Sequence, residues 1–356
     1  MTENLPRVDD AAIADLRQRL DRRRPPVLVD GPASVGVDRT ALADLLAAWR
    51  SDFDWHAVER RVAAMPWERV GALAFVHQRA ERADAPVVVL LHGWPDSVLR
   101  YERVLPLLED VHVVVPALPG FPFAAPWSPG PIDTASIATA VAAVMDQLGY
   151  DTYTVSAGDV GADVAEHLAV HHPAAVASLH LTNISPLHAV FADRTGMSDL
   201  ELDYLDLVVR WSRSEGAYVA AQSSAPGTLA VGLSDSPAGL AAWLLEKLTS
   251  WSDEPPSAQH ALEWISAYWF TNTIGSSFAT YASFVPPVPY VATPTVLSVF
   301  GHDTKPAPRE FAERFVNVRE YLTHSHGGHF AAWEQPEVYA RDLRMALGIA
   351  QTDRSA

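Results

Sequence analysis

The stretch that decides the fold is Tyr153–Ala162, with the sequence YTVSAGDVGA. Its first half is typical of a buried strand, and an amphipathic helix pattern follows it. A sharp strand-to-helix turn that exposes one side chain at its apex requires small neighbours, because the chain bends too tightly for bulk. The small residues here are Ala157, Gly158, Gly161 and Ala162. This spacing places Asp159 at the apex, where its carboxylate is a candidate nucleophile.

Two other interpretations of the turn stay open. A serine frame with Ser156 at the apex approximates the Gly-x-Ser-x-Gly elbow, but Thr154 occupies the first glycine position and the helix would start too early. Taken alone, Asp159 is also a good N-cap for the helix that follows. The aspartate frame is favoured over the serine frame because small residues occupy all of its required positions. The N-cap interpretation is disfavoured only when the other candidate residues of the site are considered together with Asp159.

Working outward from this turn, short apolar runs alternate with helical patterns. The runs are Val87–Leu91, Val111–Val115, Tyr153–Ser156, Val176–Leu181 and Thr295–Phe300. Helical patterns lie between several of them, including Thr134–Leu148 and Ala162–His171. Continuous apolar strands separated by helices predict an α/β fold with a mostly parallel sheet covered by helices on both faces.

Two segments depart from this alternation of strands and helices. Residues 186–290 have helical patterns rich in aromatic residues, which predict an inserted helical cap. Its helices are expected over Leu200–Trp211, Ala238–Trp251 and Ala258–Tyr268. Residues 1–80 predict an N-terminal extension that carries two helices, Asp10–Arg23 and Asp38–Met65, and the first strands. The sheet core is then expected over residues 81–185 and 291–356.

A candidate general base lies near the C-terminus, in the sequence HGGHFAAWEQPE that begins at His326. The two glycines let a loop bring the imidazole of His329 close to the edge of the sheet. The neighbouring His324, His326 and Glu334 raise the alternative of a metal site, but their spacing matches no strong zinc motif.

A base histidine needs a carboxylate that fixes its tautomer and stabilises the imidazolium. Asp303 directly follows the run Thr295–Phe300, at a carboxyl strand end where ligands gather in such sheets. The other place for this acid, after the preceding strand, is occupied by Asn183, so Asp303 is preferred. The order nucleophile, acid, histidine is that of α/β-hydrolases.

The sequence HGWP, at His92–Pro95, comes directly after the run Val87–Leu91. In such a fold this loop supplies a backbone amide for an oxyanion, and the amides of Trp94 and Val160 are the expected pair. His92 is expected to support the loop as a structural residue.

Composition narrows the function further. The formal net charge is −17, which disfavours a nucleic-acid partner and a strongly anionic substrate. The absence of cysteine excludes disulfides, thiolate catalysis and cysteine-based zinc sites. No signal peptide and no long uncharged apolar run are visible, so we expect a soluble cytoplasmic protein without a membrane partner.

At this point the chain resembles the microsomal-type epoxide hydrolase family, which has the α/β-hydrolase fold and an N-terminal extension. The extension motifs are Gly36–Asp38, Trp49, Phe53–Trp55 and Glu59. The core motifs are His92–Pro95, Gly158–Gly161 and Gly327–Phe330. The cap motifs are Asp235–Trp243, Glu246–Lys247, Trp251 and Tyr268–Thr273. Together they span nearly the whole chain.

The resemblance implies two cap tyrosines that donate hydrogen bonds to the epoxide oxygen, and the matching positions are Tyr218 and Tyr281. It also implies a covalent ester on Asp159 that a His329-activated water hydrolyses, without a cofactor. Residue 160 is valine where many relatives have tryptophan, which disfavours halide binding and hence dehalogenation. Members often carry an N-terminal membrane anchor that is not seen here, so the chain fits the soluble branch.

The predicted function is therefore hydrolysis of a small-molecule epoxide to a vicinal diol, in detoxification or in natural-product biosynthesis. The aromatic cap favours a bulky apolar or aryl epoxide, and a homodimer is plausible. The alternatives are a serine-type esterase that uses Ser156, an Asp-type dehalogenase and a non-catalytic ligand-binding relative.

Overall fold

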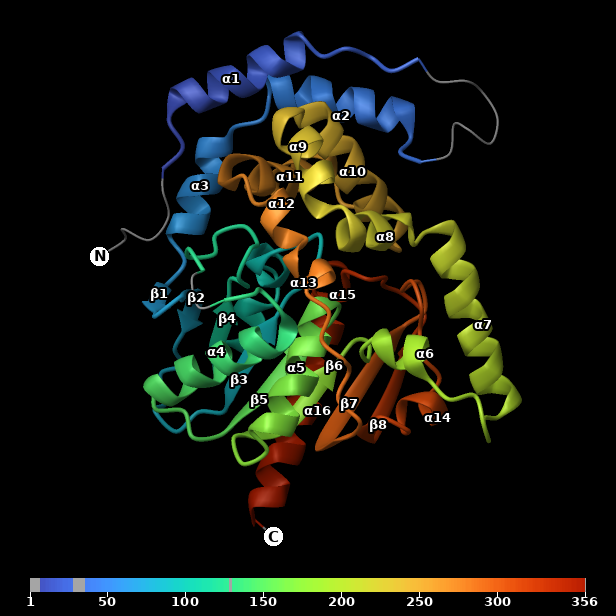
Figure 1. Cartoon of the computed structure of the whole chain (residues 1–356). Helices are drawn as coiled ribbons and strands as arrows, with labels where there is room; N and C mark the ends of the chain where they lie inside the picture. Colours follow the sequence, from blue (N-terminus) through green and yellow to red (C-terminus); the bar gives the residue numbers. More distant parts are fainter. Residues whose placement is uncertain (1–6, 28–35, 128–129, 356) are drawn as a thin grey trace.

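A computed structural model describes residues 7–27, 36–127 and 130–355 of the chain (Figure 1). Its centre is a sheet with the strand order β1-β2-β4-β3-β5-β6-β7-β8. The strands are β1 (Trp67–Val70), β2 (Leu73–Gln78), β3 (Val87–Leu91), β4 (His112–Pro116), β5 (Tyr153–Ala157), β6 (Val176–Leu181), β7 (Val291–Phe300) and β8 (Val316–His324). All pairings from β4 to β8 are parallel, and β1 and β2 form an antiparallel edge. The α/β-hydrolase fold is confirmed.

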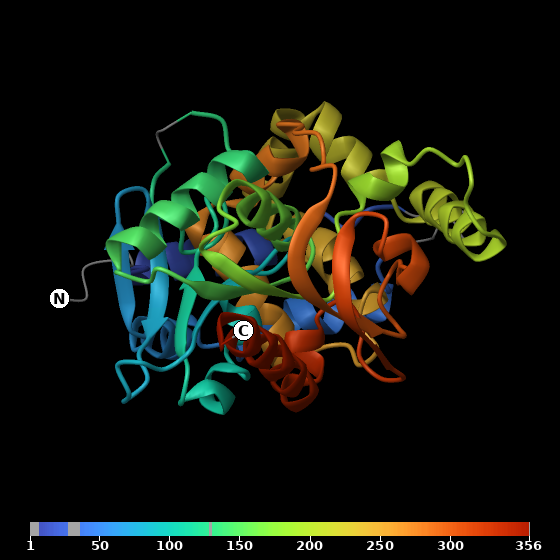
Figure 2. The same ribbon diagram turned by 90° about the horizontal axis from the view of Figure 1, so that it is seen from below.

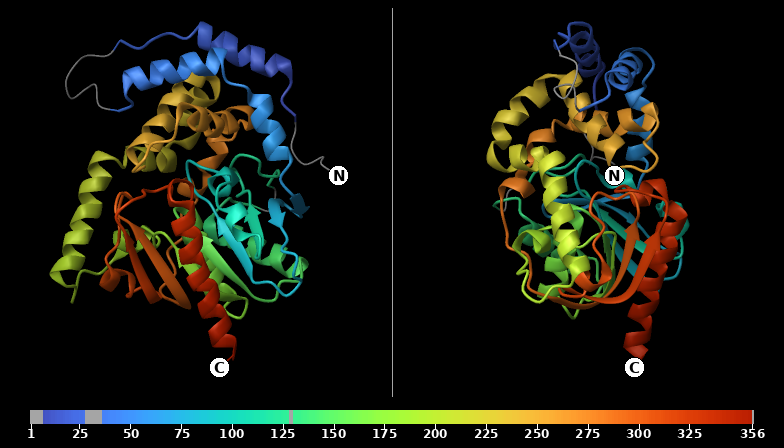
Figure 3. Two further views of the ribbon diagram at one scale, coloured as in Figure 1. Left: turned by 180° about the vertical axis from the view of Figure 1, so that it is seen from behind. Right: turned by 90° about the vertical axis from the view of Figure 1, so that its right-hand side faces the viewer.

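Helices cover both faces of this sheet, which explains why its inner strands are almost continuously apolar. On one face lie α4 (Thr134–Gln147) and α5 (Val160–His171), and on the other lies α16 (Pro336–Ser355), as Figures 2 and 3 show. The short 3₁₀ helices η2 (Val98–Tyr101) and η3 (Leu105–Leu108) follow β3.

A block of helices lies between β6 and β7, at the carboxyl ends of the parallel strands (Figure 1). Its members are α6 (Leu187–Phe191), α7 (Asp199–Ser214), α8 (Ala217–Ser224), α9 (Pro226–Asp235), α10 (Pro237–Ser250), α11 (Ala258–Thr271), α12 (Ile274–Ser277) and α13 (Ala279–Ala282). Two short helices accompany the strands that follow, α14 (Arg309–Ala312) and α15 (Ala331–Glu334). The block thus sits over the edge of the sheet where the turn after β5 emerges.

The N-terminal helices are α1 (Asp10–Asp21), α2 (Arg39–Ser51) and α3 (Trp55–Ala63). The single helix predicted over Asp38–Met65 is wrong. It is divided into α2 and α3, because Asp54 has an extended backbone and caps α3 by accepting a hydrogen bond from the Ala57 amide. Trp49 packs edge-on against Trp269 of α11, with ring centroids 6.4 Å apart. The N-terminal helices therefore cover the helical block rather than the sheet (Figure 1). Part of the predicted extension, residues 1–6 and 28–35, lies outside the described residues.

Strand β8 was not among the predicted strands, and β7 begins earlier than expected. The sequence of β8 mixes valine with polar residues, and only two of its nine residues, Val316 and Val318, are buried. Because β8 is an edge strand, it lacks the continuous apolar signature of the inner strands. In the described part of the chain, no helix combines the length and the apolar character that a membrane crossing requires.

Candidate active site

Asp159 stands at the turn between β5 and α5, with φ 54° and ψ −134°. A residue with a side chain is strained in this region of backbone space, and such strain is typical of residues that a fold holds in place for function. Its carboxylate makes no capping hydrogen bond to the helix. Asp159 therefore occupies the N-cap position of α5 without a side-chain cap, and its carboxylate faces the helical block instead.

Two glycines make room for this turn. A Cβ at Gly93 would lie 2.3 Å from Oδ1 of Asp159, and a Cβ at Gly161 would lie 2.3 Å from the Leu91 carbonyl oxygen. Both positions therefore tolerate no side chain. The glycines bring the loop after β3 against the turn after β5.

Ser156, the alternative nucleophile, lies inside β5 and is fully buried. Its hydroxyl is 2.8 Å from Nδ1 of His180 and 2.6 Å from the Tyr339 hydroxyl. The serine frame is wrong, because the turn begins after this residue and its side chain points into the core.

The loop after β3 presents its amides to Asp159. The Trp94 N–H donates to Asp159 Oδ1 at 2.7 Å, and the Val160 N–H interacts with the same carboxylate. Burial raises the pKa of Asp159, but the facing His329 and these two amides outweigh it and lower the pKa below its ordinary value of 3.8. The carboxylate is therefore ionised at neutral pH. His92 accepts a hydrogen bond from the Leu118 amide at 3.1 Å, in agreement with a structural role.

The loop after β8 places His329 between two carboxylates. Its Nδ1 is 2.9 Å from Asp303 Oδ1, and its Nε2 is 3.3 Å from Asp159 Oδ2 without hydrogen-bond alignment. Burial lowers the pKa of His329, but the Asp303 charge and the contacts with both carboxylates raise it to about 9. Asn183, just after β6, accepts a hydrogen bond from the Asp159 amide at 2.8 Å and so holds the turn, while Asp303 is the carboxylate that contacts Nδ1 of His329.

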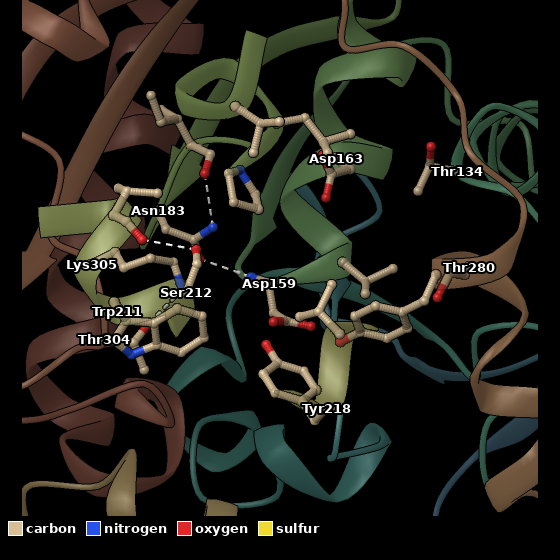
Figure 4. A pocket seen from close by; sticks show the side chains of 18 of the residues that line it. Thr134, Asp159, Asp163, Asn183, Trp211, Ser212, Tyr218, Thr280, Thr304 and Lys305 are labelled. Atoms are coloured by element: carbon tan, nitrogen blue, oxygen red, sulfur yellow. Dashed lines mark hydrogen bonds between the residues drawn. The ribbon is translucent and has the colours of Figure 1, made fainter. Parts of the chain in front are cut away.

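Tyr218 of α8 and Tyr281 of α13 approach from the helical block. The Tyr218 ring stacks on Trp94 at 5.3 Å, and the two tyrosine rings are 6.0 Å apart. Figure 4 shows the Tyr218 hydroxyl directed toward the Asp159 carboxylate. Burial, followed by the charge of Asp159, raises the pKa of both tyrosines well above 10.0. Both hydroxyls therefore remain protonated and can donate.

A cavity of about 250 Å³ connects these groups. Its walls are mostly apolar and include the side chains of Asp159, Tyr218, Tyr281, Asp303 and His329. The arrangement combines an ionised carboxylate, two hydroxyl donors and a base in one small space, which is what displacement at a carbon bearing a poor oxygen leaving group requires.

The side chains of the alternative metal cluster have separate partners. His324 pairs with Asp342 at 2.6 Å, and the Glu334 carboxylate accepts backbone N–H groups, including those of Asp253 and Gly328. Across the described ranges, no three such side chains are close enough to share a metal ion. Glu334 instead connects the His329 loop to the segment after α10.

Sequence reasoning missed a buried ion pair that joins the loop after β3 to the loop after β8. The Arg100 guanidinium donates to Asp96 Oδ2 at 2.6 Å and to the His329 carbonyl at 2.7 Å. Asp96 Oδ1 accepts the Gly93 amide at 2.9 Å. In the sequence, the spacing of four residues between Asp96 and Arg100 was the signal that could have predicted this pair. Its role in holding the two loops together follows only from the contact between Arg100 and the His329 carbonyl.

We expect Arg100→Met to lower the free energy of unfolding by about 3–5 kcal/mol, because it leaves the Asp96 carboxylate buried without its partner. Urea unfolding followed by tryptophan fluorescence measures this loss. The matched control is Arg309→Met, which removes an exposed pair with Glu313 and should cost less than about 1 kcal/mol. Equal losses in the two variants would contradict the role assigned to Arg100.

Comparison with known proteins agrees with this geometry. The family model "Epoxide hydrolase N terminus" matches residues 2–101, and the model "alpha/beta hydrolase fold" matches residues 86–336. The chain is 34% identical to a "Putative epoxide hydrolase" of Stigmatella aurantiaca, over 95% of this chain and 82% of that protein. It is 27% identical to "Epoxide hydrolase 1" of Sus scrofa, over 96% and 87%. The structure of the Aspergillus niger epoxide hydrolase superposes with a TM-score of 0.85 at 28% identity, over 96% and 94%.

Proposed function

The chain belongs to the epoxide hydrolase family and hydrolyses epoxides, and from this premise we propose that it forms a covalent ester on Asp159. The observation that supports this assignment is the ionised Asp159 carboxylate at a strained turn, facing the Tyr218 hydroxyl across the cavity (Figure 4). The product is a vicinal diol.

In the first step Asp159 Oδ2 attacks an epoxide carbon while Oδ1 stays bound to the Trp94 amide. The carbon–oxygen bond of the strained ring breaks, Tyr218 and Tyr281 stabilise the developing alkoxide, and one of them protonates it. Solvent returns a proton to that tyrosine. A carboxylate is the suitable nucleophile, because the resulting ester carbonyl belongs to the enzyme and can be hydrolysed, whereas serine would form a stable ether.

In the second step His329 Nε2 takes a proton from water, and the hydroxide attacks the ester carbonyl carbon of Asp159. Asp303 holds Nδ1 and stabilises the imidazolium. The Trp94 and Val160 amides, already directed at the carboxylate, hold the tetrahedral oxyanion. The intermediate collapses by breaking the bond between its carbon and the substrate oxygen, and the imidazolium gives its proton to the departing oxygen. This releases the diol, the proton of the new carboxyl group passes to solvent, and the carboxylate is restored, so carboxylate, imidazole and water supply the whole reaction without a cofactor.

Neither of the remaining alternatives explains the site as well. A departing halide needs no proton, so a dehalogenase has no use for two protonated tyrosines above the nucleophile. A pure binding protein has no use for a strained carboxylate beside a histidine–aspartate pair, because that strain costs stability.

We expect wild-type protein to convert styrene oxide to its diol, and the double variant Tyr218→Phe/Tyr281→Phe to lose at least about 10³-fold in kcat/KM. Each hydroxyl stabilises charge that appears only in the transition state, and one lost donor costs about 10²–10³-fold in comparable sites. Chromatography of the diol measures the rates. The single variants serve as controls and should each retain more activity than the double variant, and full activity in the double variant would remove the tyrosines from the mechanism.

We further propose that residues 186–290 act as a cap over a core of residues 81–185 and 291–356, with residues 1–80 as the extension. The supply of Tyr218 and Tyr281 by helices α8 and α13 supports this division. The homodimer, the cytoplasmic location and the preference for a bulky apolar or aryl epoxide stay predictions.

A further inference from the structure

Lys305 lies two residues after Asp303, on the loop that follows β7, and lines the cavity. Its ammonium is 3.3 Å from the centre of the Trp211 ring and donates to the Thr304 hydroxyl at 3.2 Å. Figure 4 shows Lys305, Thr304 and Trp211 together on one side of Asp159, with Thr134 and Thr280 on the other. The reaction proposed above makes no use of this cation.

The sequence makes Lys305 unusual, because only two of its 26 lysine and arginine residues are lysines. The other, Lys247, lies 5.2 Å from the ring centre of Tyr218. Both cations thus border one aromatic cluster, formed by Trp211, Tyr218 and Trp251.

The two lysines differ in how their charge is balanced. Lys247 forms an ion pair with Glu246 at 2.8 Å. Lys305 forms no ion pair with any carboxylate in the part of the chain that the structure describes. Asp303 and Asp159 act on it only through space. An ammonium group that has no directly bonded carboxylate in a mostly apolar cavity is costly, so its position favours a ligand that bonds to it.

The donor geometry indicates what such a ligand offers. An ammonium group has three N–H donors. One is used by Thr304 and the aromatic face of Trp211 covers another side of the group, which leaves donor capacity toward the cavity. Burial lowers the pKa of Lys305 to about 8, against the charges of Asp303 and Asp159, so the group remains mostly cationic at neutral pH.

We propose that Lys305 forms a subsite for a carbonyl or carboxylate oxygen on the substrate, so that the preferred epoxide carries such an acceptor away from the ring. This inference rests on the proposed function and adds a substrate class to it. The acceptor would complete the hydrogen bonding of the ammonium, while the remaining carbon skeleton contacts the apolar walls of the cavity. A free carboxylate and a neutral ester share this chemistry.

A different role for Lys305 makes a different prediction. If the cation served only to tune Asp303 and Asp159 through space, its removal would change the turnover of every epoxide by a similar factor. A subsite changes the preference between epoxides with and without the acceptor. The ratio of two kcat/KM values therefore separates the two roles.

The test compares 1,2-epoxyalkanes with methyl ω-epoxyalkanoates and their free acids of matched chain length. We expect wild-type kcat/KM to be at least about 10-fold higher for an ester or an acid at one chain length, as a charge-assisted hydrogen bond allows. Lys305→Met should reduce this ratio to about one, and Lys305→Arg should retain part of it. Arg309→Met, which removes an exposed cation four residues further along the chain, should leave the ratio and the basal turnover unchanged.

A ratio near one in the wild type at every chain length would overturn the subsite, and so would a ratio that survives in Lys305→Met. A preference for the acid alone or the ester alone identifies which acceptor is bound and supports the subsite. If the wild type hydrolyses none of these epoxides, the proposed function fails instead, so the two failures are distinguishable.

A second measurement does not depend on turnover. Protein labelled with ¹³Cε-lysine gives signals from only two lysines, and Lys247→Arg assigns them. We expect the diol product of the preferred ester or acid to shift the Lys305 signal, and the plain alkanediol of the same length to leave it in place. An unmoved Lys305 signal, or equal shifts with both diols, would overturn the subsite even if a Lys305 variant fails to fold.

Discussion

Asp159→Ala is expected to abolish diol formation, with a loss of about 10⁴-fold or more in kcat/KM for styrene oxide. Alanine removes the only carboxylate that the turn after β5 directs at the cavity beneath Tyr218, and no ester can form. Diol chromatography measures the loss. Ser156→Ala is the control for the serine alternative and should retain diol formation, because the Ser156 hydroxyl is bonded inside the core.

Isotope labelling tests the covalent step itself. In a single turnover in ¹⁸O water, the oxygen added to the first diol should come from Asp159 and carry no label. The peptide that contains Asp159 should instead gain the heavy oxygen, because water attacks the ester carbonyl carbon. Solvent label in the diol at the first turnover would show direct attack by water and would reject the ester.

His329→Gln is expected to separate the two steps and trap the ester. Asp159 can still attack, but no base deprotonates the water, so a burst of epoxide consumption stoichiometric with enzyme should precede a steady rate about 10³–10⁴-fold below wild type. Intact-protein mass spectrometry should show the protein heavier by one substrate. An unmodified mass during slow turnover would mean that His329 acts before the ester forms.

In the wild type, the pH dependence of ester formation and of ester hydrolysis follows from the pKa values of Asp159 and His329. Asp159 is ionised down to acidic pH, so ester formation persists there. The neutral imidazole is the base, and the free enzyme holds the pKa of His329 at about 9 partly through the Asp159 charge and contact. Esterification removes that charge, so the pKa of His329 falls and hydrolysis should rise with pH through an apparent pKa below about 9. Stopped-flow tryptophan fluorescence resolves both steps, and ester hydrolysis that does not vary with pH would contradict this account.

Much of the secondary structure could be predicted from short stretches of sequence, because interactions between neighbouring residues strongly influence where strands and helices form. The inner strands β3 and β6 were predicted at their observed bounds, since strands buried on both faces are continuously apolar. Two predictions failed where the local pattern was weak. The edge strand β8 mixes polar and apolar residues, and a single capping aspartate, Asp54, divides one predicted helix into two.

The sequence by itself determined the turn and its order of chemical groups. Small residues around Asp159 leave the aspartate as the only side chain at the apex, and Asp303 and His329 follow it in the order of an α/β-hydrolase. The turn could be predicted from the sequence because it depends on residues adjacent in the chain, where steric limits on the backbone act directly. The order of the three side chains is given by the chain itself.

Only the tertiary structure decided which distant groups share the cavity. It turned the Ser156 hydroxyl into the core, joined the loops of Asp96 and His329 through Arg100, and set Lys305 on the face of Trp211 beside the nucleophile. Side-chain direction and burial depend on packing between segments far apart in the chain, and no local pattern records that packing.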